Sequence, residues 1–173
     1  MSRRSGFEGL EAFVAERGTP LLATATLLAG GREEGQDLLQ EGLERLMRNW
    51  QRVDGDPEGY LRRTLYHLAV DRWRRWSRWS QVRLSVASQV PDGSEQVALR
   101  AALVASLARL PAKQRAAVVL RYWEQLSESE VADALGCSVG TVKSNTSRGM
   151  ARLRELTAGW LDEEETTYVG VVR

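Results

Sequence analysis

Residues 127–156 read SESEVADALGCSVGTVKSNTSRGMARLREL, and this stretch decides the fold of the chain. Ser127 is a favourable helix N-cap, and Glu130, three residues later, completes a capping box. Gly136 provides the positive φ that a tight turn between two helices requires. Because Ser138 can cap a second helix, the stretch predicts a helix-turn-helix.

The second helix of this stretch has an apolar face and an opposite face of small and basic side chains. The apolar face recurs at helical spacing and consists of Val142, Thr146, Met150, Leu153 and Leu156. The opposite face and its flanks consist of Gly140, Thr141, Lys143, Ser144, Ser147, Arg148 and Arg152. Small side chains let a helix approach base edges and basic ones neutralise phosphates, so this face is typical of a helix in the DNA major groove. An ordinary helical hairpin with a solvated polar face is the alternative.

The composition allows a packed core without covalent cross-links. The chain has 173 residues, of which 43% are hydrophobic, and its one cysteine, Cys137, rules out an internal disulfide framework. No apolar run reaches the length of a membrane span, and the N-terminus lacks a signal-peptide core, so we expect a cytoplasmic protein without membrane insertion. The formal net charge of +1 conceals an arginine-rich segment at 60–80 and an acidic tail at 162–165. A basic stripe of this kind is compatible with nucleic-acid binding.

The rest of the chain predicts further helices. Helical periodicity recurs in residues 7–29, 32–50, 57–80, 97–110 and 112–124. We expect the first of these to break near Gly18-Thr19-Pro20, with Thr19 as the cap of a new helix. Residues 81–96 are polar, lack periodicity and hold a Pro-Asp-Gly turn, which predicts a flexible linker. The predicted fold is all-α: a helical domain at 1–80, the linker at 81–96, a helix-turn-helix domain at 97–156, and a partly disordered tail at 157–173.

Inward positions follow from the same periodicity. In the helix-turn-helix domain they are Leu99, Leu103, Val104, Leu107, Ala116, Val119, Leu120 and Trp123. In the helix at 57–80 they are Leu61, Leu65, Leu68, Arg72, Trp76 and Trp79. The other face of that helix presents Tyr60, Arg63, His67, Val70, Asp71, Arg74 and Arg78. Such a face can stack on unpaired bases and neutralise phosphates, whereas the alternative is a solvated rim around a tryptophan-lined core.

Sequence patterns for catalysis and metal binding are absent. The chain has no Gly-rich phosphate loop, no G-x-S-x-G elbow and no cluster of Cys and His, and its one His and one Cys are far apart. We therefore expect no enzymatic activity and no cofactor.

Several segments together resemble one protein family. They are DLLQE at 37–41, PEGYLRRTLYHLAVDRWRRW at 57–76, and LARLPAKQRAAVVLRYWEQLSESEVADALGCSVGTVKS at 107–144, with the loose linker between the last two. In this order they resemble the extracytoplasmic-function (ECF) group of bacterial RNA polymerase sigma factors, in particular its actinobacterial SigE-like branch. The resemblance covers about residues 8–156.

The resemblance implies a subunit that binds core RNA polymerase and directs promoter recognition and DNA melting. The residues expected to dock on the clamp helices of the largest polymerase subunit are Asp37, Leu38, Leu39, Gln40 and Glu41. An acidic, leucine-rich helix face suits a coiled coil with basic and apolar groups, although Leu38 or Leu39 can instead belong to the core. The flap of the second-largest subunit, promoter DNA and an anti-sigma factor are the other implied partners, and the linker would lie near the active-centre and RNA-exit channels.

The resemblance also assigns the two promoter elements. Residues expected to bind the melted minus-ten box are Arg63, His67, Asp71 and Arg74 on the strand, with Val53, Asp54, Gly55 and Asp56 as a pocket for a flipped base. Those expected at the minus-thirty-five box are Thr141, Ser144, Ser147 and Arg148 as readers, with Lys143 and Arg152 on phosphates and Arg115 and Arg121 clamping the DNA backbone. Family members often carry Asn where this chain has His67, so the chain departs from the family pattern at this position.

Two other classes of protein compete with this interpretation. A one-component regulator would bind duplex DNA as a dimer and sense a ligand through residues 1–80, but no dimer face or pocket is evident there in the sequence. An anti-sigma or adaptor protein could carry the same helix-turn-helix and would inhibit transcription. The acidic tail could fold back on the basic helices, a hypothesis that rests on charge alone.

Overall fold

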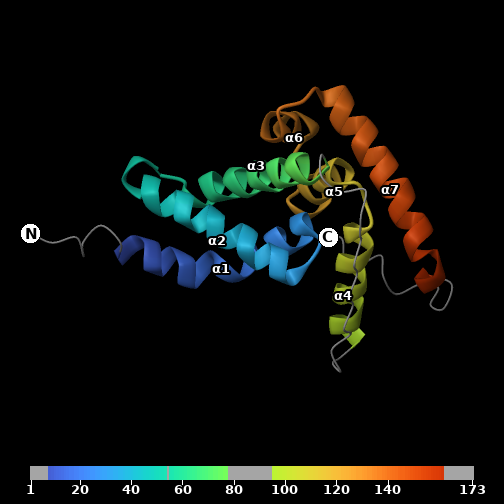
Figure 1. Ribbon diagram of the computed structural model, residues 1–173, viewed down its shortest axis with the longest axis horizontal. Helices are drawn as coiled ribbons and strands as arrows, with labels where there is room; N and C mark the ends of the chain where they lie inside the picture. Colours follow the sequence, from blue (N-terminus) through green and yellow to red (C-terminus); the bar gives the residue numbers. More distant parts are fainter. Residues whose placement is uncertain (1–7, 54, 78–94, 162–173) are drawn as a thin grey trace, which may run out of the picture. The chain divides into compact units, whose positions relative to one another are not determined.

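The computed structural model describes residues 8–53, 55–77 and 95–161 of the chain (Figure 1). Every regular element in these ranges is a helix, so the all-α prediction is confirmed. The helices are α1 (Glu8–Ala29), α2 (Arg32–Asn49), α3 (Pro57–Ser77), α4 (Glu95–Ala108), α5 (Ala112–Val118), α6 (Glu128–Leu135) and α7 (Val139–Leu161). A 3₁₀ turn, Trp50–Arg52, follows α2, and a π-helical turn, Val119–Trp123, continues α5.

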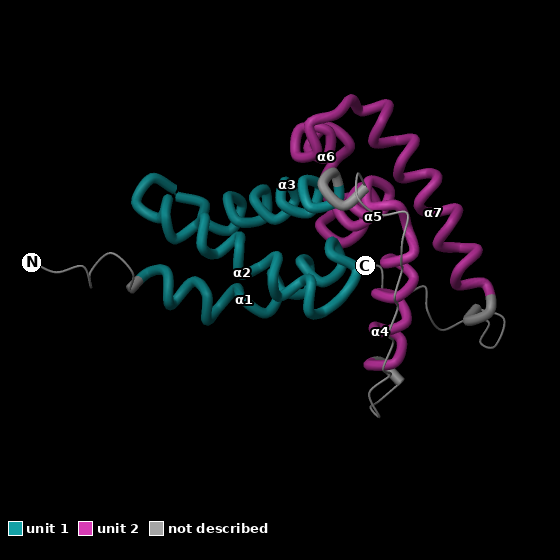
Figure 2. The backbone as a smooth tube through the Cα atoms, viewed as in Figure 1, with its two compact units in different colours: residues 1–81 teal, residues 82–173 magenta. Residues whose placement is uncertain are grey.

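The helices form two compact units, residues 1–81 with α1 to α3 and residues 82–173 with α4 to α7 (Figure 2). The predicted linker at 81–96 lies outside the described residues except for Glu95 and Gln96, which already belong to α4. Trp79 and Arg78, assigned above to the two faces of α3, also lie outside them.

Unit 1 is a three-helix assembly in which α2 packs against both α1 and α3. Its core contains leucines without any exposed surface: Leu21, Leu38, Leu46, Leu61, Leu65 and Leu68. These are the apolar stripes that the helical periodicity predicted, and their burial is the main source of stability for such a small helical unit.

Two glycines let the helices of unit 1 approach closely. A Cβ atom on Gly35 of α2 would lie 2.6 Å from the Cα and 2.7 Å from the N of Thr26 in α1. A Cβ atom on Gly42 would lie 2.8 Å from Leu61 Cδ1 and 2.9 Å from Leu65 Cδ2 of α3. The first neighbour is backbone and the second is flexible side chain, so the α1–α2 contact is the more rigid of the two.

The predicted break near Gly18-Thr19-Pro20 is wrong, because α1 continues through it with Pro20 inside the helix. Proline removes one backbone donor but its φ is compatible with a helix. Residues on the following turns, Leu21 and Ala25, are fully buried. Thr24 Oγ1 also donates to the carbonyl of Pro20 at 3.4 Å. Burial of the second half of the helix outweighs the local cost of the proline.

Unit 2 is assembled around α7, which packs against α4, α5 and α6. Its core includes Leu107, Leu120, Val142 and Leu153, which the sequence placed inside, together with Val131 of α6. A Cβ atom on Gly149 would lie 2.7 Å from Val118 Cγ2, so the absence of a side chain there lets α7 cross α5 closely. This role of Gly149 was not predicted from the sequence.

Three inward assignments in unit 2 are wrong. Leu99 and Leu103 on α4 are 40% and 39% exposed, because the buried residues among the described side chains of that helix, Ser106 and Leu107, lie at its C-terminal end. Trp123 is 51% exposed. It lies in the π-helical turn, where a wider turn rotates the residues away from their α-helical directions.

The ends of two helices in unit 2 differ slightly from the prediction. Helix α4 begins at Glu95 rather than residue 97, and α7 continues to Leu161 instead of ending near Leu156. Within this extension Thr157 Oγ1 donates to the carbonyl of Leu153 at 2.9 Å. The acidic segment at 162–165 lies outside the described residues.

Candidate nucleic-acid interface

The helix-turn-helix is built by the local signals that the sequence displayed. Ser127 Oγ accepts from the backbone N–H of Glu130 at 3.2 Å, and Glu130 Oε2 accepts from the N–H of Ser127 at 2.7 Å. Gly136 has φ +61°, with no atom within 4 Å of an added Cβ, so its backbone angle and not crowding requires glycine. Ser138 Oγ accepts from the N–H of Thr141 at 3.2 Å and so caps α7. These predicted caps are confirmed.

Glu130 is an exposed residue whose ionisation is coupled to the cap. The Ser127 side chain and then its backbone N–H lower the pKa of the Glu130 carboxyl. Each hydrogen bond to the carboxylate favours its charged form. The negative charge also lies in the first turn of α6, where the helix dipole favours it.

Helix α7 separates a packing face from an outer face. Val142, Gly149 and Leu153 are buried. The outer positions Thr141, Lys143, Ser147, Arg148 and Arg152 are all exposed. Ser144 is half-buried, and its hydroxyl donates to the carbonyl of Thr141 at 3.0 Å. Val139 at the start of the helix is 39% exposed, although the sequence analysis gave its side chain no role.

Some cations of unit 2 already have partners within the protein. Lys143 Nζ lies 3.5 Å from Glu128 Oε2, and Arg152 Nη1 lies 2.7 Å from Glu155 Oε2. Both pairs are solvent-exposed and therefore weak, so phosphate groups could displace the carboxylates. Arg115 donates to the carbonyls of Leu107 and Ala108 at 3.5 and 3.2 Å, at the C-terminal end of α4.

Arg121 donates to the carbonyl of Leu126. Like Arg115, it therefore bonds to a backbone carbonyl of its own unit, and the DNA-backbone clamp expected of both arginines stays a prediction.

Helix α3 likewise separates a buried face from an exposed face. It begins at Pro57, and Asp56 Oδ1 accepts from the N–H of Gly59 at 2.7 Å, so Asp56 caps the start of the helix. Arg63, His67 and Asp71 follow one another at helical spacing and are exposed. Arg74 continues this spacing on the backbone of α3, and its side chain lies outside the described residues.

The expected base pocket is described only in part. Val53 is half-buried, and Gly55 and Asp56 are exposed, whereas Asp54 lies outside the described residues. Gly55 has φ +79°, which makes the loop turn sharply before α3.

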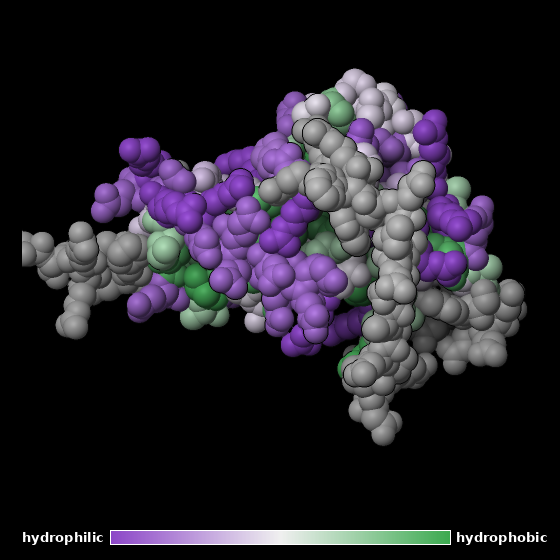
Figure 3. All heavy atoms as spheres, viewed as in Figure 1, coloured by the Kyte–Doolittle hydropathy of each residue, from purple (hydrophilic) through white to green (hydrophobic). Residues whose placement is uncertain are grey.

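In the space-filling view the visible surface over unit 1 is largely hydrophilic (Figure 3).

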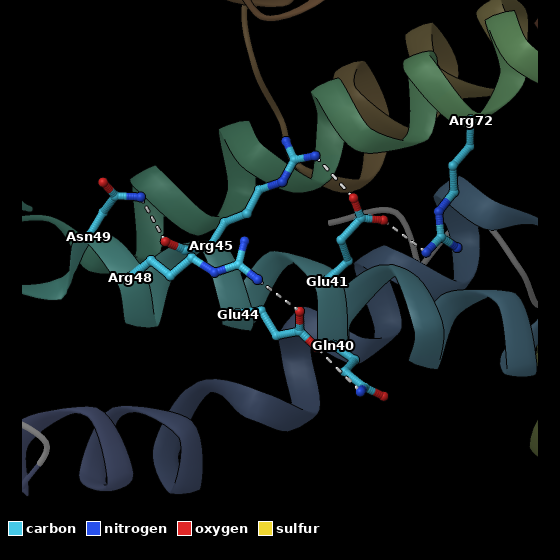
Figure 4. A network of polar contacts seen from close by, with 7 residues as sticks. All are labelled: Gln40, Glu41, Glu44, Arg45, Arg48, Asn49 and Arg72. Atoms are coloured by element: carbon cyan, nitrogen blue, oxygen red, sulfur yellow. Dashed lines mark hydrogen bonds and ion pairs between the residues drawn. The ribbon is translucent and has the colours of Figure 1, made fainter.

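The DLLQE segment lies in the middle of α2 and divides between surface and core. Asp37 and Gln40 are exposed, and Leu39 is at the edge of burial. Leu38 has no exposed surface, so a direct contact of its side chain with a partner is not available and its role is in the core. Glu41 is half-buried and bonded to Arg45 and Arg72 (Figure 4).

A groove of about 390 Å³ lies beside this segment, between α1 and α2. Its lining is mostly apolar and consists of Leu10, Val14, Leu22, Gln36, Leu39, Gln40, Leu43, Glu44 and Met47. Met47, which belongs to this lining, is 45% exposed, so part of the apolar surface of the groove faces solvent. The groove was not predicted, because it needs two helices that only tertiary packing brings together.

Comparison with known proteins identifies both units. Residues 13–79 match the model of sigma-70 region 2, and residues 100–153 match that of sigma-70 region 4. The RNA polymerase sigma-E factor of Streptomyces coelicolor is 40% identical over 164 residues, which cover 90% of this chain and 93% of that protein. The chain belongs to the ECF sigma factors of RNA polymerase.

Other relatives agree with this assignment. The ECF sigma factor SigM of Mycobacterium tuberculosis is 34% identical over 134 residues, covering 76% of this sigma factor and 68% of the relative. Among solved structures, the sigma factor RpoE in complex with the anti-sigma factor NepR from Bartonella quintana is 26% identical, with a TM-score of 0.62 over 87% of this chain and 98% of the other.

A second solved structure is similar in fold. CnrH in complex with the cytosolic domain of CnrY has a TM-score of 0.55 and covers 95% of this sigma factor and 92% of the other chain, at 22% identity. The resemblance drawn from the sequence is thus confirmed, and a sigma factor is favoured over a one-component regulator. None of the helices in the described ranges has the length and apolar character needed to cross a membrane.

Proposed function

We propose that this sigma factor divides its work among three helices. Helix α2 docks on core RNA polymerase, α3 binds the melted minus-ten box, and α7 reads the minus-thirty-five box. The protein contributes binding and no catalysis, and it acts in the cytoplasm, where polymerase and chromosome are. The observation that carries the proposal is the separation of faces, since α3 and α7 each bury one side in their own unit. The other side exposes Arg63, His67 and Asp71 on α3 and Thr141, Lys143, Ser147, Arg148 and Arg152 on α7.

The proposed polymerase surface combines charge and an apolar groove. Asp37 and Gln40 supply exposed polar groups, and the groove beside them, with Leu39 and Met47 in its lining, supplies an apolar surface. Together they suit a helical partner that presents basic and apolar side chains. The flap of the second-largest subunit is proposed as the partner of unit 2.

The decisive experiment is run-off transcription with core polymerase on a genomic DNA library, followed by mapping of the start sites. We expect a set of start sites that share two sequence elements and depend on the added protein. If no start site depends on it, or if the protein fails to copurify with core enzyme, the proposed function is wrong.

The role of α7 can be tested at Arg148. Replacing Arg148 with Ala should weaken binding of the holoenzyme to duplex minus-thirty-five DNA by about 1–3 kcal/mol, because one positioned contact is lost. Arg109→Ala removes another exposed arginine of unit 2, outside α7, and serves as the matched control. Equal losses for the two variants would show that general charge, and not the α7 face, determines binding.

We also propose that an anti-sigma factor restrains this protein, since both similar solved structures are anti-sigma complexes. The tagged sigma factor would be purified from its own cells at native levels, and any co-eluting protein added to run-off transcription. Loss of the transcript is expected. A transcript that persists at saturating amounts of each co-eluting protein would contradict the proposal.

A further inference from the structure

Glu41 lies in the segment expected to contact polymerase, yet both of its carboxylate oxygens are bound within the protein (Figure 4). Oε1 accepts from Arg45 Nη2 at 3.0 Å, one turn along α2. Oε2 accepts from Arg72 Nη2 at 3.1 Å, across the interface on α3. The Glu41 side chain is 33% exposed, so it is less available to a partner than its exposed neighbours Asp37 and Gln40.

The contact with Arg72 belongs to a set that fixes α3 against α2. At the end of α2, Asn49 Nδ2 donates to Tyr60 Oη on the first turn of α3, at 3.2 Å. Between these two polar contacts, Gly42 lets Leu61 and Leu65 pack closely against α2. The antiparallel pair is thus held at its loop end by Tyr60 and towards the far end of α3 by Arg72.

Arg72 lies beside the proposed minus-ten residues. It directly follows Asp71, and the same half of α3 carries His67 and Arg74. Any rotation or lift of this half would displace those residues relative to the loop that holds the proposed base pocket. Geometry of this kind matters because two contacts have to form at the same time. The flipped base has to enter its pocket, and the phosphates of the strand have to reach the residues that bind them.

We propose that Glu41 is a positioning residue, which holds Arg72 and the second half of α3 in the setting that promoter melting requires, and that it does not itself contact polymerase. This inference rests on the proposed function of α2 and α3. Removing the Glu41 charge would leave the guanidinium groups of Arg45 and Arg72 without the anion between them, so α3 would shift as they separate. The pair is partly exposed, so its effect declines as salt increases.

The test separates binding of polymerase from promoter opening. Holoenzyme is reconstituted with Asp37→Asn, Glu41→Gln, Arg72→Gln, or the double variant Glu41→Gln/Arg72→Gln. Glu16→Gln, which removes a 72%-exposed carboxylate paired with Arg17, is the matched control in unit 1. Two quantities are measured: the Kd for core polymerase by fluorescence competition, and the fraction of open complex by permanganate reactivity at saturating sigma factor on the strongest mapped promoter.

We expect Glu41→Gln to leave the Kd for core polymerase within about twofold of wild type and to lower the open-complex equilibrium constant about fivefold. The double variant should open the promoter no worse than either single variant, because the effects of two residues in direct contact are not additive. Asp37→Asn should do the reverse, raising Kd and sparing the open complex at saturation. Glu16→Gln should change neither. The defect of Glu41→Gln should shrink between 50 and about 300 mM salt.

Two results would overturn the inference. In the first, Glu41→Gln raises the Kd for core polymerase as much as Asp37→Asn does and leaves promoter opening normal. In the second, the losses of open complex caused by Glu41→Gln and Arg72→Gln add up in the double variant. If the Glu41→Gln protein no longer unfolds cooperatively on heating, the Arg72→Gln variant alone provides the test. It keeps the Glu41–Arg45 pair and should show the same defect in promoter opening. If Asp37→Asn leaves the Kd for core polymerase unchanged, the proposal that this surface of α2 binds polymerase is wrong, whatever the result at Glu41.

Discussion

At the scale of single residues, the capping box of α6 joins stability to protonation. Ser127 and Glu130 each satisfy a backbone N–H of the other, at a helix start where such groups otherwise have no partner. The lowered pKa of Glu130 has a definite sign in this linkage. A carboxyl whose pKa is lower in the folded state contributes stability above its unfolded pKa and loses that contribution as the pH falls through the folded value.

Replacing Ser127 with Ala should therefore lower the unfolding free energy of unit 2 by about 1 kcal/mol, because it removes the cap. Glu130→Gln should remove part of the acid-side decline in stability, since it no longer titrates. Chemical denaturation at a series of pH values below neutral measures both effects. A Glu130→Gln profile as steep as that of wild type would contradict the assigned coupling.

Single residues also show where sequence reasoning succeeded. The caps at Ser127, Ser138 and Asp56 were predictable because donor and acceptor are three residues apart and need no knowledge of the fold. The Glu41–Arg72 pair joins residues 31 positions apart. Neither this pair nor the internal partners of Arg115 and Arg121 follow from local spacing, because each depends on how the helices pack.

At the scale of helices, the contact between α1 and α2 is set by a glycine against backbone. A side chain at Gly35 would collide with Thr26 main-chain atoms, which cannot rotate away. Gly18, in the middle of α1, has as its nearest neighbour Val14 Cγ1 at 3.8 Å, an ordinary contact distance. The same substitution should thus have opposite effects at the two positions.

Gly35→Ala should destabilise unit 1 by about 1–3 kcal/mol, because the helices must move apart. Gly18→Ala should stabilise it by about 0.5–1 kcal/mol, since alanine restricts the unfolded chain and favours the helix. Thermal unfolding followed by far-UV circular dichroism compares the two variants directly. A stabilising Gly35→Ala would mean that the close approach described above is relaxed in solution.

The elements themselves were largely predictable, and the errors have physical causes. Long periodic stripes gave α2, α3 and α7, because amphipathic burial dominates their stability. The break expected at Pro20 did not occur, since tertiary burial overrode a local signal. The apolar pattern does not reveal the π-helical turn at Val119–Trp123, because the spacing fits an ordinary α-helix. This turn exposes Trp123, which the pattern placed inside.

At the scale of the whole molecule, each unit has a core of its own. The buried leucines of α1 to α3 lie in unit 1, and Leu120, Val131 and Val142 lie in unit 2. Since a core is what makes unfolding cooperative, we expect each unit to unfold in a transition of its own. The exact domain boundaries and a role for the acidic tail stay predictions.

Calorimetry of the full chain should accordingly show two transitions. Gly35→Ala should lower the temperature of one of them, and Ser127→Ala that of the other, by about 4–8 °C for each kcal/mol in units of this size. A single transition that both substitutions shift equally would show that the two units unfold together.

The crossing at Gly149 has a consequence for how such proteins diverge. Since α7 packs on α5 through a residue with no side chain, beside Val118 and Gln114, this contact does not involve the exposed side chains of the outer face of α7. Exchanging the exposed residues Ser147 or Arg148 need not disturb this contact. If the exposed face of α7 reads the promoter as proposed, a duplicated gene could acquire new target promoters through a few substitutions on that face. The same scaffold could then be engineered into a set of sigma factors that each recognise a different promoter.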